Sequence, residues 1–278
     1  MLLPSGNTAL KWMKTKSLLQ RLRGFEPNLP VYLEFENFVV KTARTPAELR
    51  EVLELRHEIF VKEWQGRRLP FGVDVDKYDF EADHLIIWCK QRQKPVGTYR
   101  LLCSRFTHQF YSQSEFDMDR FLRWGFTKLE LGRACVHPDF RNGNTIDLLW
   151  KGLSRCIELA EVRFLFGCSS VRINDQRRSE SLMKGFFEAG QWSDDFEIRP
   201  NKKYSYPQFS IGSGFPLTPV EMRRLVPPLL RSYLSAGAKV YGHPAYDRVF
   251  ECIDVLTILD LQNLPPRFHQ RFFSEKDV

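Results

Sequence analysis

The residues best placed to do chemistry lie between positions 130 and 146. Glu130 and Arg133 are charged side chains in a run that otherwise reads as a buried strand. A loop rich in Gly and Asn follows at 141–144, and the first turn of a helix comes directly after it. The first N–H groups of a helix have no intrahelical partner and attract phosphate. The segment therefore predicts a transferase that grips a phosphate-bearing carrier.

A second charged group is expected around Arg56. This arginine falls in the apolar stripe of a predicted helix that starts with a capping box at 45–48 and runs to about Lys62. An inward-facing guanidinium requires a carboxylate partner. Several acids follow in the polar loop at 65–83. The alternative is that the head group of Arg56 reaches the edge of the domain and solvent.

The other elements must position these side chains. Alternating or continuous apolar runs predict strands, and helical apolar spacing with caps predicts helices. Strands are expected at 35–43, 85–90, 96–103, 129–136, 164–171, 239–242 and 249–260, and further helices at 144–161 and 229–236. The strand, loop, helix and strand of 129–171 make a parallel crossover unit. The predicted fold class is α/β (α+β): a mixed, mostly antiparallel central sheet, a parallel splayed pair in its middle, and flanking helices.

Composition narrows the class of protein. The chain has 278 residues, a formal charge of +7 and a pI near 9.1, which suits an acidic partner or an anionic membrane surface. The positive charge is scattered and no nucleic-acid-binding motif appears, so we expect no nucleic-acid partner. The six cysteines show no Cys-x-x-Cys spacing. They predict reduced core thiols in a cytoplasmic protein and no metal site.

The N-terminus differs from the rest of the chain. We expect a basic, helical extension at 1–34 and a single domain at 35–278, because no linker interrupts the chain after Pro30. Residues 8–24 combine basic and apolar side chains with no acid, which is typical of a helix lying in a membrane interface. This predicts peripheral binding to the inner face of the membrane. The alternative is an extension that docks on its own domain or is frayed.

The order of motifs resembles the GNAT acyltransferase fold, and more specifically the ornithine N-acyltransferases of bacterial ornithine-lipid synthesis. The similar blocks, spread over about residues 50 to 260, are Asp-His-Leu-Ile at 83–86, Val-Gly-Thr-Tyr-Arg-Leu at 96–101, Glu-Leu-Gly-Arg-Ala-Cys-Val at 130–136, Leu-Leu-Trp-Lys-Gly at 148–152, Phe-Gly-Cys-Ser-Ser at 166–170, Tyr-Leu-Ser-Ala-Gly-Ala at 233–238, Pro-Ala-Tyr-Asp-Arg at 244–248 and Ile-Asp-Val-Leu at 253–256. The resemblance implies transfer of a 3-hydroxyacyl chain from acyl carrier protein to the α-amine of an amino acid, with ornithine as the expected acceptor.

A more distant resemblance links the chain to acyl-homoserine-lactone synthases. This resemblance rests on residues that occur in a similar order, namely Arg56, Phe60, Trp64, Asp76, Asp79, Arg100 and Glu130. The two resemblances agree on an acyl-carrier donor and differ in the product. A signal synthase or another N-acyl amino acid synthase is therefore the alternative activity.

The phosphate loop departs from that of relatives that use acetyl-CoA. Asn144 and Ile146 stand where those relatives have small residues, and Ile146 obstructs the close approach of a pyrophosphate. The phosphopantetheine arm of acyl carrier protein presents a single phosphate, so it is favoured as donor over acyl-CoA. The residues expected to bind the arm are His137, Arg141, Asn142, Gly143, Asn144 and Thr145. For His137, capping or packing is the alternative role, and the loop as a whole could be a simple turn.

Acyl transfer to an amine needs a base and a donor to the thioester carbonyl. Glu130 is the candidate base, because burial in a strand can bring a carboxyl group toward neutral titration. The N–H near Val136, where the strand splays from its neighbour, is the candidate carbonyl donor. Arg133, on the same strand, completes the catalytic group. The alternative for Glu130 is a permanent ion pair with Arg133, Arg100 or Arg56.

The acceptor needs its own contacts, since a diamino acid carries two amines and a carboxylate. Asp76 and Asp79 are expected to hold its cationic end, with Arg56 or Arg100 near its carboxylate. The alternative for each acid is a solvated or turn-forming residue.

Basic side chains near the predicted phosphate-loop helix could meet an acidic carrier protein. They are Arg141, Lys151, Arg155, Arg172, Arg177 and Arg178. The alternative is that they form an ordinary solvated surface. A rival of another class is a non-catalytic acyl-carrier or lipid-binding module that uses the same fold.

Overall fold

The computed structural model describes residues 6–273, with side chains described from residue 13 onward. The chain divides into two compact units. The first contains the chain up to Thr107 together with Gly132–Ala160, and the second contains His108–Leu131 and the chain from Glu161 onward. The fold class expected from the sequence is confirmed, because the strands form a mixed, mostly antiparallel sheet with flanking helices.

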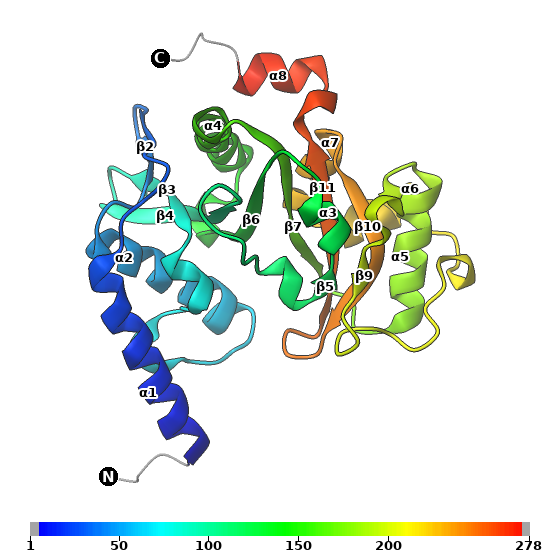
Figure 1. Cartoon of the computed structure of the whole chain (residues 1–278), viewed down its shortest axis with the longest axis horizontal. Helices are drawn as coiled ribbons and strands as arrows, with labels where there is room; N and C mark the ends of the chain where they lie inside the picture. Colours follow the sequence, from blue (N-terminus) through cyan, green and yellow to red (C-terminus); the bar gives the residue numbers. More distant parts are fainter. Residues whose placement is uncertain (1–5, 274–278) are drawn as a thin grey trace. The chain divides into compact units, whose positions relative to one another are not determined.

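The first unit contains four antiparallel strands in the order β1-β2-β3-β4. Its elements are α1 (Gly6–Arg21), η1 (Leu22–Gly24), β1 (Tyr32–Glu34), β2 (Phe38–Thr42), α2 (Pro46–Arg56), η2 (His57–Glu63), η3 (Pro70–Gly72), η4 (Lys77–Phe80), β3 (Asp83–Cys89), β4 (Lys94–Cys103), the end of β6 (Thr127–Val136), η6 (Pro138–Phe140) and α4 (Gly143–Ala160). In Figure 1, β3 and β4 lie between α4 and α2.

Local sequence explains how α2 starts and how it is extended. The Thr45 side chain accepts a hydrogen bond from the Glu48 N–H, and Pro46 occupies the first turn, as the capping box predicts. After Arg56 the helix continues in wider π-helical turns through Glu63, where Trp64 N–H donates to the Ile59 carbonyl. The two segments together cover the single helix that was predicted to end near Lys62.

Strand β3 is buried on both faces. Leu85 faces α4, because a Cβ atom placed on Gly152 would lie 2.7 Å from its side chain, and the next residue, Ile86, packs with Leu49 and Leu53 of α2. Successive residues of a strand point to opposite faces, so this strand has helices on both sides. Glycine at 152 is therefore required by the close approach of α4 to the sheet.

The end of the N-terminal extension packs on the first unit. Leu22 and Phe25 are buried in a core cluster that includes Val52 of α2, and Asn28 and Leu29 donate their N–H groups to the Asp83 carboxylate. These contacts agree with the docking alternative for residues 22–29. The side chains of residues 8–12, within the segment predicted to meet a membrane, lie outside the described part. No helix within residues 6–273 combines the length and apolar character that crossing a membrane would require.

The second unit contains strands in the order β6-β7-β11-β10-β8 and a two-stranded sheet of β5 and β9. Its elements are η5 (Ser112–Ser114), β5 (Phe116–Asp117), α3 (Asp119–Arg123), the start of β6, β7 (Val162–Val171), α5 (Gln176–Glu188), β8 (Trp192–Ser193), η7 (Asp195–Glu197), β9 (Arg199–Pro200), η8 (Ile211–Ser213), α6 (Pro219–Leu225), α7 (Pro228–Ser235), β10 (Lys239–Asp247), β11 (Cys252–Asp260), η9 (Leu261–Asn263) and α8 (Pro266–Phe272). Leu182 and Phe186 of α5 and Leu230 of α7 share a core cluster with Val240 and Val255 of the sheet.

The pairing of the parallel strands β6 and β7 is irregular, with a register shift between Thr127 and Lys128. Their register runs from Thr127 opposite Val162 to Glu130 opposite Phe166. A Cβ atom on Gly167 would lie only 2.2 Å from the Leu131 carbonyl oxygen, so this close approach requires glycine. Arg133 then adopts φ +49°, a left-handed angle that is uncommon for a residue with a side chain. Strand β6 thus changes course just after Glu130.

Candidate functional site

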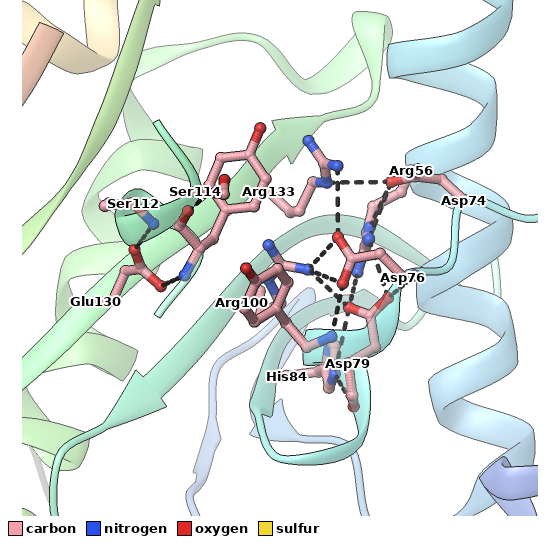
Figure 2. Close-up of polar contacts among 12 residues, drawn as sticks. Arg56, Asp74, Asp76, Asp79, His84, Arg100, Ser112, Ser114, Glu130 and Arg133 are labelled. Atoms are coloured by element: carbon pink, nitrogen blue, oxygen red, sulfur yellow. Dashed lines mark hydrogen bonds and ion pairs between the residues drawn. The ribbon is translucent and has the colours of Figure 1, made fainter. Parts of the chain in front are cut away.

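Six charged residues of the first unit form what we call the arginine–aspartate cluster: Arg56, Arg100, Arg133, Asp74, Asp76 and Asp79 (Figure 2). Arg56 is completely buried, and its guanidinium donates to Asp79 at 2.6 and 3.3 Å and to Asp74 at 3.0 Å. Arg100 donates to both carboxylate oxygens of Asp76 at 2.7 and 2.8 Å and to Asp79 at 3.2 Å. The inward-facing Arg56 therefore has the carboxylate partners that its position demanded.

The elements that hold the cluster are short and heavily capped. Asp76 caps η4 by accepting the Tyr78 N–H, and the Asp79 carboxylate accepts the Asp76 N–H in return. Arg56 comes from the end of α2, Arg100 from β4, and Arg133 from the left-handed position in β6. The acidic loop thus folds around the arginines and is not a solvated surface loop.

Opposite charges compensate inside the cluster. Three arginines face three aspartates, so the formal charges cancel. Burial by itself would raise the pKa of Asp76, but the charges of Arg100, Arg133 and Arg56 outweigh burial and hold that pKa well below its ordinary value. The pKa of Asp74 is lowered in the same way, with Arg56 and Arg133 acting against burial. Asp74 and Asp76 are therefore ionised at neutral pH.

His84 lies beside the cluster and was not among the predicted site residues. Its Nε2 is 3.0 Å from the Asp79 carbonyl oxygen, and its Nδ1 has no hydrogen-bond partner within the described chain. Burial lowers the pKa of His84 to about 4, so the imidazole is neutral at physiological pH. The motif at 83–86 placed this histidine in a strand, but no spacing in the sequence pointed to its contact with Asp79.

The residues predicted to contact the acceptor bind one another in the structure. The carboxylates of Asp76 and Asp79 accept hydrogen bonds from arginines, and Arg56 and Arg100 spend their donors on these aspartates. Arg133 is more accessible: 18% of its side chain is exposed, and its nitrogens lie 3.4 Å from Asp74 and 3.5 Å from Asp76. An acceptor carboxylate would reach Arg133 more readily than Arg56 or Arg100.

The predicted phosphate loop is a compact turn at the start of α4. His137 accepts the Asp139 N–H and so caps η6, which is the alternative role considered for it. The Asn142 side-chain oxygen accepts the Thr145 N–H at 3.2 Å, and the Thr145 hydroxyl donates to the Phe140 carbonyl at 2.6 Å. The helix starts at Gly143, one residue before the predicted start.

Two features of this turn bear on ligand binding. A Cβ atom on Gly143 would meet nothing within 4 Å, so neither packing nor backbone angle requires glycine there. The guanidinium of Arg141 forms a double ion pair with Glu63 at 2.7 and 2.6 Å, and its Nε donates to the Val136 carbonyl. Exposed pairs of this kind are weak, so an anionic ligand could compete for Arg141. Asn144 is exposed beside it.

Glu130 lies in the second unit and is only 2% exposed. Its two carboxylate oxygens accept the Ser112 N–H at 2.6 Å and the Tyr111 N–H at 2.8 Å (Figure 2). These bonds hold the carboxylate at the start of the η5 turn. The sequence predicted burial of Glu130 but could not identify this turn, which lies 18 residues earlier in the chain.

Val136 ends β6, and the next residue, His137, donates its N–H to the Val96 carbonyl at 2.8 Å. The paired register of β6 with β7 runs from Thr127 to Glu130, which lies six residues before Val136. This is the divergence expected of a splayed parallel pair.

Comparison with known proteins agrees with this geometry. Residues 55–151, which include the arginine–aspartate cluster and the turn at α4, match the family model described as an acetyltransferase (GNAT) domain. This segment is similar to a GNAT domain. The mixed sheet with the parallel pair β6 and β7 is consistent with a GNAT-like fold, and the resemblance seen in the sequence is confirmed.

Curated relatives extend the similarity over most of this acyltransferase. The L-ornithine N(alpha)-acyltransferase of Brucella abortus (strain 2308) is 28% identical over 256 residues, covering 85% of this chain and 89% of the relative. The protein of the same name from Rhizobium meliloti (strain 1021) is 27% identical over 246 residues, covering 84% of this chain and 83% of the relative.

Solved structures of similar fold include two signal synthases. The AHL synthase LasI aligns with a TM-score of 0.47 and 10% identity, covering 86% of this chain and 96% of LasI. The CoA-dependent acyl-homoserine lactone synthase BjaI aligns with a TM-score of 0.41 and 17% identity, covering 84% and 85%.

Proposed function

We propose that this acyltransferase moves a 3-hydroxy fatty acyl group from acyl carrier protein to the α-amine of ornithine, giving a lyso-aminolipid. The observation that carries the proposal is the similarity, over about 85% of the chain, to relatives named L-ornithine N(alpha)-acyltransferase. The predicted GNAT-like fold and the buried Glu130 on its central strand are consistent with that chemistry.

The donor would bind at the start of α4. The first N–H groups of this helix favour a phosphate, and the open space beside Gly143 leaves room for one. Arg141 would exchange its exposed pair with Glu63 for the phosphate of the phosphopantetheine arm. His137, Asn142, Asn144 and Thr145 shape the same turn. The basic residues of α4, Lys151 and Arg155, would steer an acidic carrier protein toward it.

Acyl transfer to an amine needs a nucleophilic attack, a proton acceptor and a donor to the oxyanion. The α-amine attacks the thioester carbon, a C–N bond forms and the C–S bond breaks, and the sulfur leaves as a thiolate. Glu130 takes the proton that the amine loses, either directly or through a water. The N–H of Val136 donates to the developing oxyanion. Arg133 would bind the acceptor carboxylate, with the rest of the arginine–aspartate cluster fixing its position.

The decisive experiment supplies the purified protein with 3-hydroxyacyl carrier protein and ornithine and identifies the product by mass spectrometry. We expect Nα-(3-hydroxyacyl)ornithine, a slower reaction with the matching acyl-CoA, and a rate that falls as salt screens the carrier protein. Formation of an acyl-homoserine lactone in expressing cells would support the signal-synthase alternative. Carrier-protein binding without acyl transfer would support the non-catalytic alternative.

A further inference from the structure

Three buried carboxyl groups lie close together in the second unit, although they are far apart in the sequence. Glu115 follows η5, Asp247 ends β10, and Asp254 lies in β11, yet one carboxyl oxygen from each of them lies within 4.8 Å of the other two. All three side chains are buried. We call this group the carboxyl triad. Sequence reasoning missed it, because 132 positions separate Glu115 from Asp247.

The members of the triad differ in how they are satisfied. Asp254 accepts the Ser170 hydroxyl at 2.5 Å, and Asp247 accepts the Val249 and Phe250 N–H groups at 2.7 and 3.1 Å. Glu115 is only 1% exposed, and neither of its carboxyl oxygens has a hydrogen-bond partner of regular geometry within the described chain. A buried polar group without a partner is costly and requires an explanation. Tyr111 and Asp254 act on Glu115 through side-chain hydrogen bonds, but neither brings a positive charge to the carboxyl groups.

The triad shares structural elements with the candidate base. The turn that gives the Tyr111 and Ser112 N–H groups to Glu130 ends at Glu115, whose own N–H donates to the Ser112 carbonyl. On the sheet side, Asp254 of β11 is opposite Ser170 of β7, four residues after Phe166, the residue of β7 that is opposite Glu130. One turn and one strand end therefore connect the triad to Glu130 within the same unit.

Electrostatics supports the same proximity. The thiol of Cys168 has a pKa raised well above its ordinary value by burial and by the negative charges of Glu115, Asp254 and Glu130. A thiol that senses all three groups lies within a short range of each. The carboxyl triad is thus close to the carboxylate expected to deprotonate the acceptor amine.

We propose that the carboxyl triad binds the side-chain ammonium of the diamino-acid acceptor while the α-amine of the same molecule reacts. This inference rests on the proposed function and adds the subsite that would select a diamino acid. A primary ammonium has three N–H donors and can satisfy three carboxyl groups at once. With the side-chain amine held there, the α-amine is the one left to be acylated.

A monovalent ammonium suits the triad better than a divalent metal. Calcium takes six to eight oxygen ligands, and magnesium requires a near-octahedral set. The triad and the Ser170 hydroxyl offer fewer protein ligands than such sites use, and two of the carboxylates already accept protein donors. Metal binding is therefore the competing outcome of the test.

The test compares ornithine with norvaline, which has the same carbon chain without the side-chain amine. The wild-type protein should use ornithine with a kcat/KM about 100-fold or more above norvaline, because unpaired buried groups penalise the analogue. Glu115→Gln should reduce that preference at least about 10-fold through a higher KM for ornithine, with little change for norvaline. Glu188→Gln, an exposed acid on α5 of the same unit, should leave the preference unchanged.

A measurement on the wild-type protein covers the case in which Glu115→Gln fails to fold. Ornithine should raise the melting temperature, whereas norvaline at the same concentration should not. Equal use of both amino acids, an unchanged preference in a folded Glu115→Gln protein, or equal thermal shifts would each overturn the inference. So would Mg²⁺ or Ca²⁺ binding that depends on Glu115 and activity that EDTA abolishes.

The two proposals fail in different ways. Absence of acyl transfer to any amine would remove the proposed function, but an ornithine-specific thermal shift lost in Glu115→Gln would still support an ammonium site. Efficient acyl transfer without discrimination against norvaline would keep the proposed function and remove the ammonium site.

Discussion

The arginine–aspartate cluster of the first unit and the carboxyl triad of the second unit each bring three carboxyl groups together, by opposite means. In the cluster, three guanidinium groups balance three aspartates, and the arginines hold the pKa values of Asp74 and Asp76 below their ordinary value. In the triad, Glu115 has two unsatisfied oxygens, and burial together with the charges of Asp254 and Asp247 raises its pKa to about 9, although Tyr111 acts in the opposite direction. The first group is complete without a ligand, and the second is not.

This difference separates structural charges from charges available for function. A buried ion pair whose members satisfy one another stabilises a local arrangement, and losing one partner is expensive. A buried carboxyl group without a donor is retained at a cost to stability and is therefore a candidate for binding or catalysis. Glu130 is a third case, because its buried carboxylate accepts two backbone N–H groups, and the role proposed for it rests on its place in the central strand.

The largest expected effect is on catalysis by Glu130. Glu130→Gln should lower kcat for acyl transfer by about 100- to 10,000-fold, because the amide cannot accept the amine proton. The NH₂ group of glutamine would also replace one of the two oxygens that accept a backbone N–H at the start of η5. Two donors would then face each other, so the melting temperature should fall modestly. Steady-state kinetics and circular dichroism measure the two effects. Unchanged kcat in a folded variant would remove Glu130 from the mechanism and leave it a structural residue.

The next effect concerns stability of the cluster. Arg56→Ala should reduce the free energy of unfolding by about 3–5 kcal/mol, because it leaves the buried Asp79 and the half-buried Asp74 without their partner. Arg50→Ala, which removes an exposed i,i+4 pair with Glu54 on the same helix, should cost no more than about 0.5 kcal/mol. Urea unfolding of both variants measures the difference. Similar costs for the two would show that the cluster is not the structural charge group that we describe.

The smallest effect is a pH dependence that comes from Glu115. Its folded-state pKa of about 9 exceeds the ordinary value of 4.5 that applies when the chain is unfolded, so the folded protein holds an extra proton between these values. Its contribution to stability is complete below about pH 4.5 and declines as the pH rises toward 9, by at most about 1.4 kcal/mol per pH unit. The groups that face it are Asp254, Asp247, Tyr111 and Cys168.

Unfolding at pH 7 to 8.5 isolates this contribution, because His84, with a pKa lowered to about 4 by burial, no longer titrates there. The wild-type protein should lose more stability across this range than Glu115→Gln does. Parallel pH profiles of the two proteins would show that Glu115 is already ionised in the empty site, which would weaken the contrast with the cluster.

Much of the fold could be predicted because it depends on local sequence. The capping box at Thr45 starts a helix where expected, and α7 ends before Gly237, which adopts φ +96°. Helix α4 and strand β6 lie within two residues of their predicted bounds. Strand β10 is longer than predicted because its register with β11 shifts between Tyr241 and Ala245 and the strand then continues. Helix α5 was not among the predicted elements.

The candidate site could be predicted only in part. Burial of Glu130 and the turn at Asn142 follow from the pattern of neighbouring residues. The partners of Asp76 and Asp79 do not, since a loop rich in acids is equally compatible with solvent, an acceptor amine or arginines. The fold selected arginines by bringing α2, β4 and β6 to the same loop.

The sequence by itself determined the element order, the capped helix starts and the charged central strand, because each depends on side-chain types at short, regular spacing. Only the tertiary structure decided which charges compensate one another and which carboxyl groups converge. Glu115 and Asp254 are 139 residues apart, and no periodicity relates residues at that separation. Their proximity arises from the pairing of β7 with β11 and the placement of the η5 turn, which are set by packing of the whole unit.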